Sequence, residues 1–253
     1  MDAAGHPHRR ALLTGGLVAA AAALTGCSSN SAPKSAPKSA DAAPKATTPP
    51  PAPRPTTAKD AFARLMDGNK RWVNGNLQHP DRDPTRRELV AQSQEPYGVV
   101  LSCIDSRVPP ELLFDTGLGD LYVLRTGAQT VGPVVTGSVE YGPMTSGTPL
   151  IVVLGHQRCG AVESSYKAMR EDEALPGNLN AIAEALRPAY ERTIKRPGAD
   201  PVDTMARNQA RMTAADLRTN RDLAPLVKKR SLAVVSAYYS LDTGKVEVLT
   251  GAP

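Results

Sequence analysis

Residues that carry chemistry are scarce in this sequence. Its 253 residues include three cysteines, four histidines, one tryptophan and two phenylalanines. Three cysteines are too few for a disulfide-dense scaffold. Only His79 and His156 lie beyond residue 8, so a zinc site made of three histidines is excluded by count. The longest apolar stretch, residues 11–24, is too short and too rich in alanine and glycine for a comfortable membrane span.

An excess of one charge is also lacking in most of the chain, although the calculated pI is about 9.2. Residues 1–57 hold six of the 30 Lys and Arg residues but only two of the 25 Asp and Glu residues. Residues 58–253 therefore hold 24 basic and 23 acidic residues and are close to neutral. Because the basic excess belongs to the N-terminal segment, we expect no face that binds nucleic acid.

The N-terminal segment has the pattern of an export leader. Arg9 and Arg10 precede the apolar stretch 11–24, as in a signal peptide. The paired arginines resemble the bacterial twin-arginine export signal. Leu24-Thr25-Gly26-Cys27 resembles a lipobox, in which Cys27 is acylated. The alternative is an ordinary cleavage site with an incidental cysteine.

Composition divides the chain into three parts. Residues 1–27 form the predicted signal peptide, and residues 28–57, rich in Ala, Pro, Lys, Ser and Thr, form a predicted disordered tether. Residues 58–253 are predicted to form one domain. A lipid anchor on Cys27 would hold this domain at the outer face of the cytoplasmic membrane, and without the anchor the protein would be secreted.

Hydrophobic periodicity predicts an α/β fold with a mostly parallel central sheet. Short runs rich in Val, Leu and Ile predict strands at 98–102, 121–125, 150–154, 232–239 and 246–249. Helical spacing predicts helices at 58–75, 136–141, 161–170, 179–193 and 202–220. Most strand runs do not alternate, which is typical of a parallel sheet covered by helices on both faces. The turn at 241–245 predicts that the last strand returns antiparallel at an edge.

The reactive side chains directly follow two of the predicted strands. Cys103 comes after the strand at 98–102, and the segment His156-Gln157-Arg158-Cys159 comes after the strand at 150–154. Since ligand sites of doubly wound sheets lie beyond the carboxyl ends of the strands, we expect these residues to meet. Two thiolates and one imidazole suit zinc and leave one position open. The alternative is a Cys103–Cys159 disulfide in a structural lipoprotein.

Asp105 and Arg107 are placed to assist such a metal ion. Zinc with two thiolate ligands acidifies water less than zinc bound by imidazoles, so a second group must help to produce hydroxide. If Arg107 grips Asp105, the carboxylate stays ionised, keeps clear of the metal and accepts a hydrogen bond from the zinc-bound water. The alternative is a surface ion pair of little consequence.

Two motifs resemble the signatures of the β-class carbonic anhydrases: SCIDSRV at 102–108 and GHQRCGA at 155–161. Further segments resemble bacterial members in the same order, namely FARLMDGNKRW (62–72), FDTGLGDLYVLR (114–125), GSVEYG (137–142) and LIVVLG (150–155). The resemblance covers most of residues 58–165 and continues more weakly through 238–244.

The resemblance implies reversible hydration of CO2 to bicarbonate and a proton by zinc-bound hydroxide. The two thiolates and the imidazole named above would hold one zinc ion per chain, with Asp105 and Arg107 as the dyad beside the metal-bound water. The backbone N–H of Gly160 would help to orient the substrate. In some relatives the aspartate becomes a fourth zinc ligand at lower pH, so Asp105 would alternate between two roles.

The resemblance also implies a homodimer or a larger homo-oligomer. The N-terminal helix at 58–75 would then embrace the partner and cover Phe62 and Trp72. The sequence departs from the usual pattern at Gly127-Ala128, where bacterial relatives more often show Ala-Gly. A glycine needed for positive φ would be misplaced, which predicts a shifted loop and a changed rate. His79, in a polar loop, is assigned no role in proton transfer.

Two other functions remain open at this point. A hydrolase of carbonyl sulfide or carbon disulfide would use the same fold and ligands. A catalytically silent lipoprotein that binds zinc or bicarbonate would keep the ligands without the reaction. The intact Asp105–Arg107 pair favours the catalytic interpretation, since a silent protein has no need of it.

Overall fold

The computed structural model describes residues 53–253. The predicted signal peptide, Cys27 and most of the predicted tether lie outside the described residues. Within residues 53–253, none of the helices has the length and apolar character that crossing a membrane requires.

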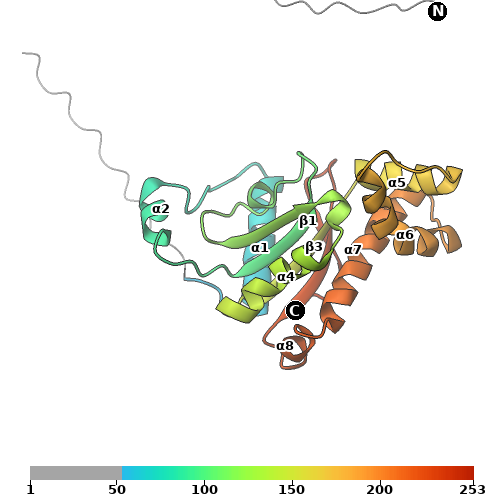
Figure 1. Ribbon diagram of the computed structural model, residues 1–253. Coiled ribbons are helices and arrows are strands. Elements are labelled where there is room, and N and C mark those ends of the chain that lie inside the picture. The colour runs from blue at the N-terminus through green and yellow to red at the C-terminus, as the bar shows by residue number, and fades with distance from the viewer. Residues whose placement is uncertain (1–52) are drawn as a thin grey trace, which may run out of the picture. The chain divides into compact units, whose positions relative to one another are not determined.

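Helices separate the first four strands along the described chain, and a run of four helices precedes the last two strands (Figure 1). The strands are β1 (Gly98–Cys103), β2 (Leu121–Thr126), β3 (Leu150–His156), β4 (Ala233–Tyr239) and β5 (Val246–Thr250). The longer helices are α1 (Ala58–Val73), α4 (Pro133–Tyr141), α5 (Gly160–Glu171), α6 (Leu179–Lys195) and α7 (Pro201–Thr219). These elements confirm the predicted ones, with ends that coincide or differ by at most three residues.

Three short helices were not predicted: α2 (Pro84–Val90), α3 (Pro110–Leu113) and α8 (Ala224–Lys228). Each has a proline in its first turn, where the missing N–H costs no hydrogen bond. They have seven, four and five residues, which is too short for an apolar period to emerge from the sequence.

The five strands form one sheet in the order β2-β1-β3-β4-β5. β1 pairs in parallel with both β2 and β3, and β3 pairs in parallel with β4. β5 pairs antiparallel with β4 at the edge, as the turn at 241–245 predicted. The predicted mostly parallel sheet with one antiparallel edge strand is therefore confirmed.

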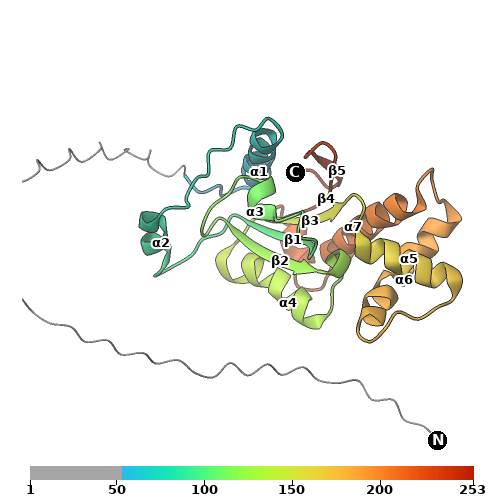
Figure 2. The same cartoon turned by 90° about the horizontal axis from the view of Figure 1, so that it is seen from above.

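Helices cover both faces of the sheet, which explains why its strands are apolar throughout. In Figure 2, α1 and α3 lie on one side of the strands and α4 lies on the other. Val99 and Leu101 pack in the core cluster that includes α4 and buried residues from the second half of α7, whereas Val100 packs in the cluster that includes α1. Successive side chains of a strand point to opposite faces, so both sets must be apolar.

Helix α1 lies against the domain's own core. It begins after Thr57, whose hydroxyl oxygen accepts a hydrogen bond from the Asp60 N–H at 3.1 Å. Phe62 and Trp72 are partly buried against the core cluster, and Trp72 Nε1 donates to the Tyr239 hydroxyl at 3.1 Å. The domain itself therefore covers part of these two aromatic side chains, and the covering of the remainder by a partner subunit stays a prediction.

Contacts with the domain begin upstream of the predicted boundary at residue 58. Arg54 Nε donates to the Glu95 carbonyl at 2.6 Å, and its Nη2 donates to the Pro96 carbonyl at 3.1 Å. Pro55 is buried. Although this segment has the composition of the tether, the described part of it from Arg54 onward packs on the segment that precedes β1.

Candidate metal centre

The order of the strands brings two of the predicted ligands together. β1 lies between β2 and β3, so the chain leaves β1 toward one side and returns on the other side with β3. A ligand site is expected at this switch point, beyond the carboxyl ends of the two strands. Cys103 is the last residue of β1 and His156 is the last residue of β3. Parallel pairing of Ser102 with Leu154 aligns these two ends.

Cys159 completes the cluster from the cap position before helix α5. The candidate ligand atoms of Cys103, His156 and Cys159 lie within 4.8 Å of one another, and all three residues are buried. Asp105 is not among the residues of this cluster. The described residues thus bring together the three side chains that the sequence predicted as metal ligands.

The two sulfurs are spaced for a shared metal ion and not for a disulfide. Cys103 Sγ and Cys159 Sγ are 3.8 Å apart, and both cysteines are free. A disulfide bond would need a separation of about 2.0 Å. Two zinc–sulfur bonds of about 2.3 Å at a tetrahedral angle place the sulfurs about 3.8 Å apart. The alternative of a Cys103–Cys159 disulfide is therefore rejected.

Of the two ring nitrogens of His156, one has a hydrogen-bond partner and the other has none among residues 53–253. Its Nδ1 lies 3.0 Å from the Gln157 carbonyl oxygen, which accepts a hydrogen bond, so Nδ1 carries the proton. Its Nε2 is buried and has no hydrogen-bond partner among residues 53–253. A buried acceptor without a partner is costly. A metal ion bound at Nε2 would remove that cost, so the residues present fit a metal.

The two thiols are electrostatically coupled. The hydrogen bond from the Cys159 thiol lowers the pKa of Cys103, opposed by burial. The Ala128 N–H, 3.4 Å from Cys103 Sγ, lowers it further. The same contact with Cys103 raises the pKa of Cys159, and burial adds to that rise. One proton leaves the pair readily, and the second would leave only beside a cation.

Arg107 holds Asp105 next to the cluster through a two-pronged contact. Arg107 Nε donates to Oδ1 at 2.9 Å and Nη2 donates to Oδ2 at 2.6 Å. The Arg107 backbone N–H donates to Oδ1 as well, at 2.9 Å. The side-chain hydrogen bonds from Arg107 lower the pKa of Asp105 to about 2. Only 15% of the Asp105 side chain is exposed, so solvent screens this pair less than an ordinary surface ion pair.

The loop at Gly127-Ala128, where the sequence departs from the usual Ala-Gly, has an unusual backbone conformation. Ala128 and Gln129 have φ values of +51° and +46°, so the left-handed conformation falls on residues other than glycine. A Cβ atom at Gly127 would lie 2.7 Å from Cδ1 of Ile182, so the end of the Ile182 side chain would have to move to admit an alanine there. The Ala128 N–H reaches Cys103 Sγ at 3.4 Å, and the expected shift of the loop relative to relatives stays a prediction.

Arg125 contributes to the site and was missed by the sequence analysis. Its Nε donates to the Cys103 carbonyl at 2.8 Å, and its Nη2 donates to the Asp105 carbonyl. It thereby fixes the backbone that carries a ligand and the carboxylate. The signal was available, since a charged residue inside an apolar edge strand needs polar partners. His79 is not part of the cluster, and its backbone N–H donates to Asp115 at 3.0 Å.

Fold and site together define an α/β protein in which two cysteines and one histidine that could hold a metal ion meet at the carboxyl edge of a parallel sheet. The family model described as carbonic anhydrase matches residues 98–246, which include all three predicted ligands. This chain belongs to the carbonic anhydrase family.

Two mycobacterial relatives align with most of the chain. The carbonic anhydrase of Mycolicibacterium smegmatis is 38% identical over 189 residues, which cover 74% of this chain and 91% of that protein. Carbonic anhydrase 2 of Mycobacterium tuberculosis is 36% identical over 186 residues, which cover 73% of this chain and 89% of that protein. The prediction of the family from the two motifs is therefore confirmed.

Solved structures confirm the fold at lower sequence identity. One of the two tetrameric β-carbonic anhydrases of Sordaria macrospora superimposes with a TM-score of 0.61 at 21% identity and covers 77% of this chain and 100% of its own. A Coccomyxa β-carbonic anhydrase in complex with acetazolamide has a TM-score of 0.58 at 22% identity and covers 74% of this chain and 86% of its own. The fold is that of the β-carbonic anhydrases.

Proposed function

We propose that this chain catalyses the reversible hydration of CO2 to bicarbonate and a proton at the Cys103–His156–Cys159 cluster. The observation that carries the proposal is the buried Nε2 of His156, which has no partner among the described residues and lies beside sulfurs spaced 3.8 Å apart. A cation at this place would satisfy the nitrogen and both sulfurs together. The two mycobacterial relatives, both carbonic anhydrases by name, support this activity.

One zinc ion per chain fits these ligands. Sulfur and imidazole ligands suit zinc, whereas magnesium and calcium prefer oxygen. Three protein ligands leave one position for water or substrate. Zinc held there would supply a Lewis acid that makes water nucleophilic near neutral pH. The contact of His156 Nδ1 with the Gln157 carbonyl keeps the ring in the tautomer that such binding requires.

Asp105 would orient the attacking water, and Arg107 would keep Asp105 ready to do so. An ionised carboxylate can only accept hydrogen bonds, so Asp105 would bind the water through the O–H that points toward it. Arg107 donates two hydrogen bonds to Oδ1 but only one to Oδ2, so Oδ2 keeps a lone pair free for the water. For Asp105 to become a fourth metal ligand, it would have to leave this contact with Arg107.

Gly160 would help to orient the substrate through its backbone N–H. It is the first residue of α5, directly after Cys159, where backbone N–H groups have no partner within the helix. Gly160 is exposed, and a Cβ atom built on it would meet no other atom within 4 Å. The space beside Gly160 is therefore open, which supports access of a small molecule such as CO2 or bicarbonate to this end of the helix.

The proposal is tested on purified residues 53–253 by zinc analysis and stopped-flow CO2 hydration. We expect about one zinc ion per chain and hydration activity, and we expect Cys159→Ser to lose both. His79→Ala, which changes a histidine outside the cluster, should keep both. Zinc without hydration would favour a silent zinc-binding protein. Hydrolysis of carbonyl sulfide or carbon disulfide without CO2 hydration would favour the hydrolase, and absence of zinc would overturn the proposal.

The export and anchoring of the protein are part of the proposal and are supported by the sequence alone. Residues 1–27 would act as a twin-arginine-type signal peptide, and residues 28–57 would connect an acylated Cys27 to the domain at the outer face of the cytoplasmic membrane. Labelled palmitate should enter the wild-type chain but not Cys27→Ala. Replacement of Arg9 and Arg10 by lysine should retain the protein inside the cell. Secretion of wild-type protein without lipid would contradict the anchor.

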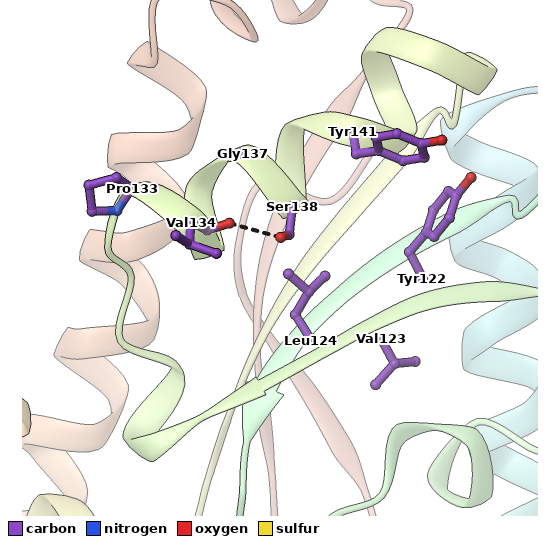
Figure 3. A pocket seen from close by; sticks show the side chains of 8 residues that line it. All are labelled: Tyr122, Val123, Leu124, Pro133, Val134, Gly137, Ser138 and Tyr141. Carbon is purple, nitrogen blue, oxygen red and sulfur yellow. Dashed lines mark hydrogen bonds between the residues drawn. The ribbon is translucent and has the colours of Figure 1, made fainter.

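We also propose that the protein forms a homodimer or a larger homo-oligomer through the β2 edge. β2 has one hydrogen-bonded neighbour, β1, in the sheet of the described residues, and all six of its residues are only half-buried. A hollow of about 440 Å³ lies between β2 and α4 and is lined by apolar and aromatic side chains, including Leu124, Tyr122 and Tyr141 (Figure 3). Such an edge with an apolar rim is typical of a self-complementary interface.

The occupant of this edge is tested by light scattering of residues 53–253. Val134 beside the hollow is 84% exposed, so Val134→Asp should leave the fold intact while it weakens association. Ile194→Asp serves as the control, because Ile194 is 51% exposed and does not line the hollow. A wild-type monomer, or equal effects of both substitutions, would contradict an interface at β2.

A further inference from the structure

The two ligands from the second motif are joined by a very short turn. Only Gln157 and Arg158 separate His156 from Cys159. Arg158 has a φ of +50°, in the left-handed region that is unfavourable for a residue with a Cβ atom. A conformation of this kind persists only where the surrounding structure holds it. Contacts from other parts of the chain must therefore hold this turn.

The two carbonyl groups of the turn orient the residues of the site. The Gln157 carbonyl oxygen lies 3.0 Å from His156 Nδ1 and so fixes the plane of the imidazole. The Arg158 carbonyl oxygen accepts a hydrogen bond from Arg107 Nη2 at 3.1 Å. Arg107 in turn grips Asp105. A rotation of either peptide group would misplace a metal ligand or the carboxylate beside it.

Asp242, in the turn between β4 and β5, holds both side chains of the ligand turn. Its Oδ1 accepts from Arg158 Nη2 at 2.7 Å, and its Oδ2 accepts from Arg158 Nη1 at 3.1 Å and from Gln157 Nε2 at 2.9 Å. The Gln157 side-chain oxygen accepts in return from the Asp242 N–H at 3.3 Å. This is a closed set of four hydrogen bonds between two turns that are far apart in the sequence.

The turn that carries Asp242 is itself anchored on α1. The buried Asn69 side chain donates to the Gly244 carbonyl at 2.9 Å and accepts from the Val246 N–H at 2.9 Å. Gly244 has a φ of +69°, and a Cβ atom there would lie 3.0 Å from Trp72 Nε1. Asp242 therefore projects from a turn that is fixed on both sides, and it is able to transmit that rigidity to the ligand turn.

We propose that Asp242 is a positioning residue of the metal centre. It fixes the conformation of Gln157 and Arg158, and the carbonyl groups of these two residues set the directions of His156 and Arg107. This inference rests on the proposed function of the cluster, since it assigns Asp242 to the same site. Outer contacts of this kind change metal affinity by about 10- to 100-fold in other metal sites.

If Arg158 and Asp242 formed only a surface ion pair, removal of Asp242 would have little effect on the site. Arg158 and Asp242 have side chains that are 54% and 57% exposed, and exposed ion pairs alone contribute little to stability. The chain offers a matched control in the Glu184–Arg187 pair on α6, which is also two-pronged, at 3.0 and 2.7 Å, and is 52% and 48% exposed. If Asp242 were only a surface partner, removal of Asp242 and removal of Glu184 would have equal effects.

The experiment compares Asp242→Ala, Asp242→Asn and Glu184→Ala with the wild type. Zinc affinity is measured by competition with a chromophoric chelator, and the ligand geometry by the visible absorption bands of the cobalt-substituted protein. We expect Asp242→Ala to lower zinc affinity about tenfold and to shift the cobalt bands. Asp242→Asn, which keeps an oxygen acceptor, should lie between alanine and wild type, and Glu184→Ala should change nothing. For CO2 hydration, kcat should fall in Asp242→Ala with KM unchanged.

Equal zinc affinity and equal cobalt spectra for Asp242→Ala and Glu184→Ala would overturn the inference. If Asp242→Ala does not fold, the isosteric Asp242→Asn decides the question by the same two measurements. A wild-type protein that binds zinc but does not hydrate CO2 would refute the proposed reaction. The affinity and the spectrum would still test Asp242, so the two failures are distinguishable.

Discussion

The protein holds two buried polar clusters that differ in one respect. At Asp115, whose side chain is fully buried, every donor comes from the chain: Arg71 Nε at 2.7 Å, the Gln78 N–H at 2.9 Å and the His79 N–H at 3.0 Å. At the metal centre, the Nε2 of His156 is equally buried but lacks a partner among the described residues.

This difference separates a structural cluster from a functional one. Burial raises the pKa of Asp115, but the hydrogen bonds from Gln78, Arg71 and His79 outweigh it and lower the pKa overall. The carboxylate is thus stabilised by the fold alone. His156 is stabilised only in part, because its Nε2 has no partner among the described residues. Other buried side-chain atoms also lack a partner, so the missing partner is informative here because two free thiol sulfurs lie beside it in a group that could hold a metal ion.

The largest expected effect separates the two clusters by metal binding. His156→Leu should lower zinc affinity at least about 100-fold, because one of three ligands is lost. The free energy of unfolding of the metal-free protein should change by less than about 1 kcal/mol, since the imidazole makes a single hydrogen bond, from Nδ1 to the adjacent Gln157 carbonyl, and its Nε2 lacks a partner there. Zinc titration and urea denaturation measure the two quantities. A large loss of stability without metal would mean that His156 is structural like Asp115.

The converse result is expected for Asp115→Ala. Removing one partner of a buried charge cluster should reduce the free energy of unfolding by about 3 kcal/mol, because Arg71 and two backbone N–H groups lose their acceptor. Zinc content and zinc affinity should stay at the wild-type level. Urea denaturation measures the loss of stability, and metal analysis of the folded fraction measures zinc. A loss of zinc from folded Asp115→Ala would contradict a purely structural role of Asp115.

A smaller effect on stability is expected at Asp105. Its carboxylate is held by donors from the chain, like that of Asp115, but it lies close to the candidate metal ligands. The wild-type folded pKa is about 2 because of Arg107, below the unfolded value of about 3.9. The pair therefore stabilises the fold above about pH 4, and this contribution is lost as the pH falls toward 2. Arg107→Ala should cost on the order of 1 kcal/mol at pH 6. The difference from wild type, measured by denaturation, should vanish near pH 2, and a constant difference would contradict this cause.

The smallest effect is expected at the loop beside Cys103. Ala128→Gly should stabilise the protein by about 0.5 kcal/mol, since relief of the left-handed φ slightly exceeds the entropy that glycine loses on folding. Gly127→Ala should act in the opposite direction, because its Cβ atom would press on Ile182. Thermal unfolding of both variants checks the signs, and destabilisation by Ala128→Gly would show that the alanine methyl group packs favourably.

Most of the fold could be predicted from the sequence because its signals are local. Unbroken apolar runs indicated the strands of a parallel sheet, and the turn at 241–245 indicated the antiparallel edge. The helices α2, α3 and α8 escaped prediction because they are too short to show a period. Phe62 and Trp72 were assigned to a partner, and the structure adds that the domain itself covers part of each, which cannot be read from hydrophobicity alone.

The sequence by itself indicated which side chains could bind a metal, because Cys103, His156 and Cys159 are the reactive groups that follow strands of one sheet. Tertiary structure decided how they are held. The contacts of Arg125, Asp242 and the Ala128 N–H depend on side chains and peptide groups that are distant in sequence and meet only after the sheet and its turns have formed. The spacing of residues along the sequence indicates where strands end, whereas the direction of a hydrogen bond depends on how the folded elements pack together.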